Sequence, residues 1–169
     1  MTPSRFVLGV VAVLTALLLQ LSAVGRLPLR GAKPDILLVL VLAFGLAEGP
    51  QSGAITGFLA GLLADCFASH EMGRLAFAYA LAGYVTGNLQ DDTERSTLQP
   101  FGAVALGALV SLGAFAFEGI LFGDHRITWH AVGRAAISSV PYDVVLTPFV
   151  VPLVVGLVRR LDVDPLRRL

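Results

Sequence analysis

The chain has 169 residues with 12 basic and 12 acidic side chains, so its formal net charge is zero. Hydrophobic residues make up 56% of it and charged residues only 14%, against roughly 25% in soluble domains. This composition indicates an integral membrane protein, and the balanced charge argues for no nucleic-acid partner. A spanning helix needs about 20 residues, so about six spans would fill the chain and leave no soluble catalytic domain.

The first apolar run, residues 6–24, follows a single basic residue, Arg5. The run is longer than the roughly 7–15 residues of a signal-peptide core. We therefore interpret it as a retained first span. A signal peptide, with a cleavage site near Ser22-Ala23, is the alternative.

The second predicted span, residues 35–48, opens with Pro34 and Asp35. Proline is favoured at a helix start, and an aspartate there complements the positive end of the helix dipole. The span ends at Glu48-Gly49-Pro50, because glycine and proline together break a helix.

The third predicted span, residues 52–67, carries Gly53, Gly57 and Gly61 at intervals of four, and Asp65 completes the series. Residues four apart share one face of a helix. In water each glycine would cost roughly 1 kcal/mol against alanine, whereas in lipid it allows a neighbouring helix to approach closely. The face predicts close packing within the protomer, with packing against a partner chain, such as a homodimer, as the alternative.

Small residues at the same spacing recur in other predicted spans. They are Ala12 and Ala16 in the first span, Gly83 and Gly87 in the fourth, and Ala103, Gly107 and Ser111 in the fifth. Residues 127–140 are too mixed to span, and we expect a short interfacial helix there, where Trp129 is favoured. The sequence thus predicts one all-α membrane domain over residues 1–169, a six-transmembrane-helix bundle. Its predicted spans are 6–24, 35–48, 52–67, 74–89, 100–122 and 141–158.

Four carboxylates fall near the same ends of the predicted spans: Asp35, Asp65, Glu118 and Asp143. Charges in membrane spans usually face the bundle interior or a wet cavity, so the four predict a polar vestibule. The alternative is that each is a helix-end charge satisfied by water or by a cap. Basic residues divide evenly between the two sides, and the arginine cluster at the C-terminus favours cytoplasmic termini and an outward-facing vestibule.

The sequence predicts no catalytic residues, no metal ligands and no cofactor. His70, His125 and His130 lack the spacing of a metal site, and Ser138-Ser139 lacks the context of a catalytic nucleophile. The single cysteine, Cys66, lies in an apolar run and is expected to serve packing.

A series of residues in the first half of the chain forms a recognisable pattern. It comprises Pro34-Asp35-Ile36-Leu37, Gly49-Pro50, Gly53, Gly57-Phe58, Gly61-Leu62, Asp65, Gly73, Gly83-Tyr84 and Gly87. In this pattern the chain resembles the MreD family of bacterial rod shape-determining membrane proteins, and Arg74 is one departure from it. The resemblance implies a non-enzymatic protein of the cytoplasmic (inner) membrane. It also implies a fold similar to the S component of energy-coupling-factor vitamin transporters.

The resemblance further implies partners. The closest would be MreC, a single-span protein with a large periplasmic part, within an assembly that includes MreB, RodA and a transpeptidase and inserts peptidoglycan. The leading hypothesis is a scaffold that holds MreC against one face of the bundle.

Two other functions are weighed against the scaffold. The first is a small-molecule-binding component of a vitamin transporter, in which Ala12 and Ala16 dock the transport partner and Asp65, Glu118 and Asp143 contact substrate. The second, an intramembrane enzyme, is disfavoured because the carboxylates lie near the edges of the spans.

Overall fold

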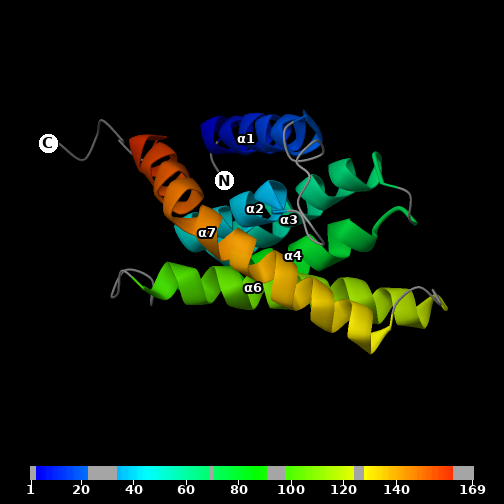
Figure 1. Cartoon of the computed structure of the whole chain (residues 1–169). Helices are drawn as coiled ribbons and strands as arrows, with labels where there is room; N and C mark the ends of the chain where they lie inside the picture. The colour runs from blue at the N-terminus through cyan, green and yellow to red at the C-terminus, as the bar shows by residue number, and fades with distance from the viewer. Residues whose placement is uncertain (1–2, 23–33, 69–70, 91–97, 124–127, 162–169) are drawn as a thin grey trace, which may run out of the picture.

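The computed structural model of the chain describes residues 3–22, 34–68, 71–90, 98–123 and 128–161. Every regular element within these ranges is a helix, which confirms the all-α prediction for this part of the chain. The helices are α1 (Pro3–Ser22), α2 (Ile36–Glu48), α3 (Pro50–Asp65), α4 (Arg74–Gly87), α6 (Gln99–Leu121) and α7 (Trp129–Leu161). In Figure 1, α1 and α6 lie on opposite sides of α2, and α7 runs obliquely across the bundle from α6 toward α1.

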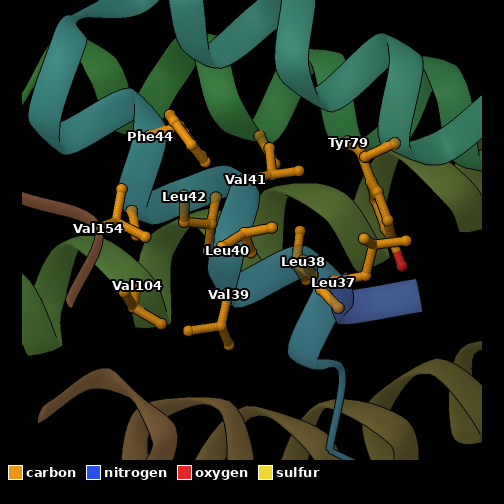
Figure 2. Close-up of a cluster of buried hydrophobic side chains, with 14 of the residues drawn as sticks. Leu37, Leu38, Val39, Leu40, Val41, Leu42, Phe44, Tyr79, Val104 and Val154 are labelled. Carbon is orange, nitrogen blue, oxygen red and sulfur yellow. The ribbon is translucent and has the colours of Figure 1, made fainter. Parts of the chain in front are cut away.

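Helix α2 forms the centre of the bundle and contacts the other five described helices. Every residue from Leu37 to Leu46 is buried, so the helix is apolar on all sides, as expected of a helix enclosed by others. Figure 2 shows its leucine, valine and phenylalanine side chains pointing in all directions, toward Val104 of α6, Val154 of α7 and the other surrounding helices. The bundle is therefore organised around a helix of only 13 residues.

Helices α3 and α4 are antiparallel and touch at their backbones. A Cβ atom on Gly53 would overlap the backbone of Gly83, and a Cβ atom on Gly83 would overlap the backbone of Gly53. One turn further on, Gly57 lies against the backbone of Tyr79, and Gly61 lies against the backbone of Leu75. Only glycine leaves room for such an approach, so the glycine face of α3 is filled by α4.

Helix α7 departs from the sequence prediction of a short interfacial helix over residues 127–140 and a last span beginning at Pro141. It is one continuous helix of 33 residues with Pro141, Pro148 and Pro152 inside it. The prediction was wrong because Pro141 removes one backbone donor but does not by itself end a helix in a membrane bundle, where neighbouring helices compensate. At about 1.5 Å per residue the helix is about 50 Å long, so it extends beyond the roughly 30 Å hydrocarbon core or tilts strongly within it.

Two described helices are long and apolar enough to cross a membrane, Gln99–Leu121 and Trp129–Arg160. Two shorter apolar helices, Val7–Ser22 and Ile36–Glu48, accompany them, and six crossings stay a prediction of the sequence.

The outer surfaces of α6 and α7 carry large exposed apolar side chains. They include Leu106, Leu109 and Phe117 on α6, and Val145, Phe149 and Leu153 on α7.

Candidate functional site

Asp35 is the centre of a polar cluster at the start of α2. Its Oδ1 atom accepts hydrogen bonds from the backbone N–H of Leu38 at 3.0 Å and from the side-chain amide of Gln20 at 3.3 Å. Its Oδ2 atom accepts a hydrogen bond from the hydroxyl of Tyr79. The side-chain carbonyl oxygen of Gln20 (Oε1) in turn accepts a hydrogen bond from the backbone N–H of Ile36 at 2.9 Å. Asp35 and Gln20 thereby cap α2, whose first N–H groups have no partner within the helix.

Asp143 joins this cluster from the middle of α7. Its Oδ1 atom accepts a hydrogen bond of 2.9 Å from the backbone N–H of Asp35. Its side chain is only 2% exposed. The sequence placed Asp143 at the start of a helix, but the continuity of α7 places it well inside the helix, facing the bundle. Two buried carboxylates from distant parts of the chain thus meet at one point.

A cavity of about 230 Å³ opens beside the two carboxylates, between α2, α4, α6 and α7. Its polar lining consists of Asp35, Tyr79, Ser111, Ser139 and Asp143. The rest of the wall is apolar and includes Leu112, Phe115 and Val140. Such a cavity, mostly apolar with a few convergent polar groups, is typical of a small-molecule site.

A second cavity, of about 250 Å³, lies on the α1 side of the same cluster. It is lined by Leu17 and Gln20 of α1 and by Phe67 after α3, together with Asp35 and Tyr79. Because Asp35 and Tyr79 line both cavities, their hydrogen-bonded side chains form part of the wall between the two.

Asp65 has a different role from Asp35 and Asp143. Its carboxylate accepts hydrogen bonds from the backbone N–H groups of Gly73 at 2.8 Å, Leu75 at 3.1 Å and Ala76 at 3.2 Å. These groups belong to the start of α4, so Asp65, the last residue of α3, caps the next helix. Asp65 therefore fits the alternative hypothesis, in which the carboxylate is a helix-end charge satisfied by capping.

Glu118 lies near Arg74 and Asp65, close enough for electrostatic interaction with both. Arg74 begins α4 and is only 3% exposed. Its guanidinium donates to the Glu71 carboxylate at 3.0 Å and lies 4.2 Å from the centre of the Phe115 ring. The four predicted vestibule carboxylates therefore differ in their contacts: Asp35 and Asp143 meet at the α2–α7 cavity, whereas Glu118 lies near Arg74 and Asp65.

Comparison with known families decides what kind of protein carries this arrangement. The sequence profile for the rod shape-determining protein MreD matches residues 2–161, nearly the whole chain. The chain belongs to the MreD family. Comparison with curated proteins and with solved structures gave no match.

Membership of the MreD family makes the chain a rod shape-determining membrane protein, as its pattern of glycines and aspartates predicted. The departure at Arg74 has a structural explanation. The side chain of Arg74 lies between Glu71 and the Phe115 ring, where its charge is paired and its stem is buried. A cation at this position is thus compatible with the buried start of α4 in this member of the family.

The predicted small-residue surfaces lie mostly inside the bundle. Gly87 packs against the backbone of Pro50, as Gly83 packs against Gly53. Ala16 of α1 is buried, and Ala12 is partly buried against the core. These small residues already contact other helices of the same chain, so a partner chain would have to bind at a different surface.

Sequence reasoning did not place four residues at the site: Gln20 and Tyr79 of the polar cluster, and Ser111 and Ser139 of the cavity wall. One signal was present, because Gln20 is one of few polar residues in the first apolar run. For Tyr79 and the two serines no sequence signal distinguishes a cavity residue from a packing residue. Among the described residues, no group of three or more His, Cys, Asp or Glu side chains forms a candidate metal site.

Proposed function

We propose that the chain is a non-enzymatic scaffold of the bacterial cytoplasmic membrane that binds MreC within the rod complex. In this role it supports peptidoglycan insertion together with MreB, RodA and a transpeptidase, and both of its termini lie in the cytoplasm. The observation that carries the proposal is the family match over residues 2–161. The exposed outer face of α6 adds to this support.

The proposed surface for the MreC span is the outer face of α6. Gly102, Leu106, Leu109, Gly113 and Phe117 share this face and are all exposed. Nothing lies within 4 Å of a Cβ atom built on Gly102 or Gly113, so each glycine leaves a notch between large apolar side chains. Membrane helices associate by packing side chains into such notches. The glycines of α3 are already filled by α4, which supports α6 as the surface for a second chain.

Co-purification and crosslinking test the proposal. The native Cys66, which is exposed, is first replaced by serine. Single cysteines are then introduced at Leu106 or Leu109 on α6, with Leu14 on α1 as the matched control because it is similarly exposed and apolar. Crosslinking to cysteines along the MreC span is expected from the α6 positions and absent from Leu14. If MreC does not co-purify with the wild-type chain, the scaffold function is wrong. If it crosslinks only through α1, the assignment to α6 is wrong.

A further inference from the structure

The cavity between α2, α4, α6 and α7 contains hydrogen-bond acceptors that the protein leaves unused. One Asp143 oxygen accepts from the Asp35 backbone, and no donor among the described residues reaches the other. The Ser111 side chain lines the same cavity, is only 5% exposed, and has no hydrogen-bond partner among those residues. Ser139 also lines the cavity, and its hydroxyl has no hydrogen-bond partner among the described residues. Asp143 and Ser111 are each more than nine-tenths buried, and a polar side chain so enclosed normally has a partner, so these two side chains point to a ligand in the cavity.

The charge around the cavity specifies the sign of that ligand. Asp35 and Asp143 bring two carboxylates together, and no cationic side chain in the described part of the chain pairs with either. The buried cation nearby, Arg74, is paired with Glu71. A carboxylate removed from water is costly unless it binds a proton, or a positive charge or enough donors compensate it, and a cation bound beside it favours the charged form. The cavity therefore suits a cationic group.

The number of available acceptors distinguishes an organic cation from a metal ion. A primary ammonium group has three donors and no acceptor. The free Asp143 oxygen and the hydroxyls of Ser111 and Ser139 supply three acceptors. Calcium takes six to eight oxygen ligands, and magnesium demands an octahedral set, whereas both oxygens of Asp35 are already occupied. The apolar wall formed by Leu112 and Phe115 suits a hydrocarbon stem rather than a hydrated ion.

We propose that this cavity binds a primary ammonium group on an aliphatic stem. Asp143 supplies the charge, Ser111 and Ser139 accept the remaining hydrogen bonds, and the apolar wall contacts the stem. At about 230 Å³ the cavity accommodates a group the size of a lipid headgroup rather than a large molecule. The ammonium group comes either from an aminophospholipid headgroup or from a soluble aliphatic amine. The inference does not depend on MreC binding.

The test uses the full chain, purified without MreC, in detergent and freed of bound lipid. Binding of n-hexylamine is measured by calorimetry and native mass spectrometry beside n-hexanol, which has the same stem and no charge. Hexylamine is expected to bind at least about tenfold more tightly than hexanol. Equal binding of the two compounds, or no binding of hexylamine and of phosphatidylethanolamine, would overturn the proposal.

Variants localise the binding. Asp143→Asn keeps an acceptor for the Asp35 N–H but removes the charge, and is expected to weaken hexylamine binding about tenfold. Ser111→Ala and Ser139→Ala are expected to weaken it less. Ser138→Ala is the matched control, because the Ser138 hydroxyl donates to the Arg134 carbonyl at 2.6 Å and does not line the cavity. Unchanged binding in Asp143→Asn would contradict the proposal. Should that variant fail to fold, the comparison of Ser111→Ala with Ser138→Ala decides.

Lipid competition distinguishes the two sources. Phosphatidylethanolamine and phosphatidylglycerol with identical acyl chains are added to the hexylamine complex. Displacement by phosphatidylethanolamine alone identifies the aminophospholipid headgroup as the ligand. If neither lipid displaces hexylamine, the ligand is a soluble amine. Each of these two outcomes supports an ammonium site. Equal displacement by both lipids would contradict it, because the site would then not recognise the amine.

Discussion

The backbone N–H of Asp35 donates a hydrogen bond of 2.9 Å to Oδ1 of Asp143, from the start of α2 to the interior of α7. The first N–H groups of a helix need partners from outside it, and α2 is the most enclosed helix of the bundle. Gln20 from α1 and Tyr79 from α4 bind at the same place. The start of the central helix is thus fixed by polar groups from three other helices.

Removal of the Asp143 carboxylate is expected to destabilise the bundle. In Asp143→Ala the buried N–H of Asp35 loses its acceptor, which costs about 1–3 kcal/mol in the free energy of unfolding. Asp143→Asn keeps an acceptor of the same shape and is expected to lose less than half as much. Unfolding by titration with sodium dodecyl sulfate measures both variants. Equal losses of unfolding free energy in the two variants would show that the hydrogen bond to Asp35 does not cause the destabilisation.

Tyr79→Phe tests the contact between α4 and the α2 cap. The substitution removes the hydroxyl that donates to Asp35 and leaves the ring in place, so a loss of about 1 kcal/mol is expected. Tyr84→Phe is the matched control, because Tyr84 lies on the exposed side of the same helix. A stability change of similar size in Tyr84→Phe would attribute the effect to the phenol in general rather than to the bond with Asp35.

Asp65→Ala is expected to loosen the junction between α3 and α4. The carboxylate of Asp65 accepts three backbone hydrogen bonds at the start of α4, and loss of a single helix cap costs about 1–2 kcal/mol. The predicted signature is local: hydrogen exchange should accelerate at Leu75 and Ala76 before the rest of the bundle. Unchanged exchange at these two amides would contradict the capping role.

The sequence predicted features that depend on local spacing. Glycine at intervals of four in α3 predicts a bare helix face, and the structure has α4 packed on that face. Spacing alone does not identify the partner helix, since that depends on the path of the chain between them. For Asp65 the sequence left two readings open, because a cap for α4 depends on how residues 66–73 turn.

The polar cluster was harder to predict because it depends on tertiary structure. Pro141 suggested a helix start, and that placed Asp143 at an end of α7 rather than in its interior. Once α7 is continuous, Ser139 and Asp143 lie one turn apart on one face, beside Ser111 of α6. Each of these residues looks unremarkable in the sequence, and only their convergence makes a site.

A pair of glycine substitutions separates folding from partner binding. Gly57→Leu places a large side chain against the backbone of Tyr79, so overpacking is expected to cost about 3 kcal/mol or more, or to prevent folding. Gly113→Leu adds the same side chain where nothing lies within 4 Å, and stability should not fall, since leucine favours a helix more than glycine does. If the α6 surface binds MreC, Gly113→Leu should nevertheless reduce MreC co-purification, because it fills the notch. Detergent-stable yield and MreC pull-down, measured on the same preparations, check both effects. Wild-type stability in Gly57→Leu would refute the backbone contact between α3 and α4, and wild-type MreC recovery in Gly113→Leu would refute the proposed surface.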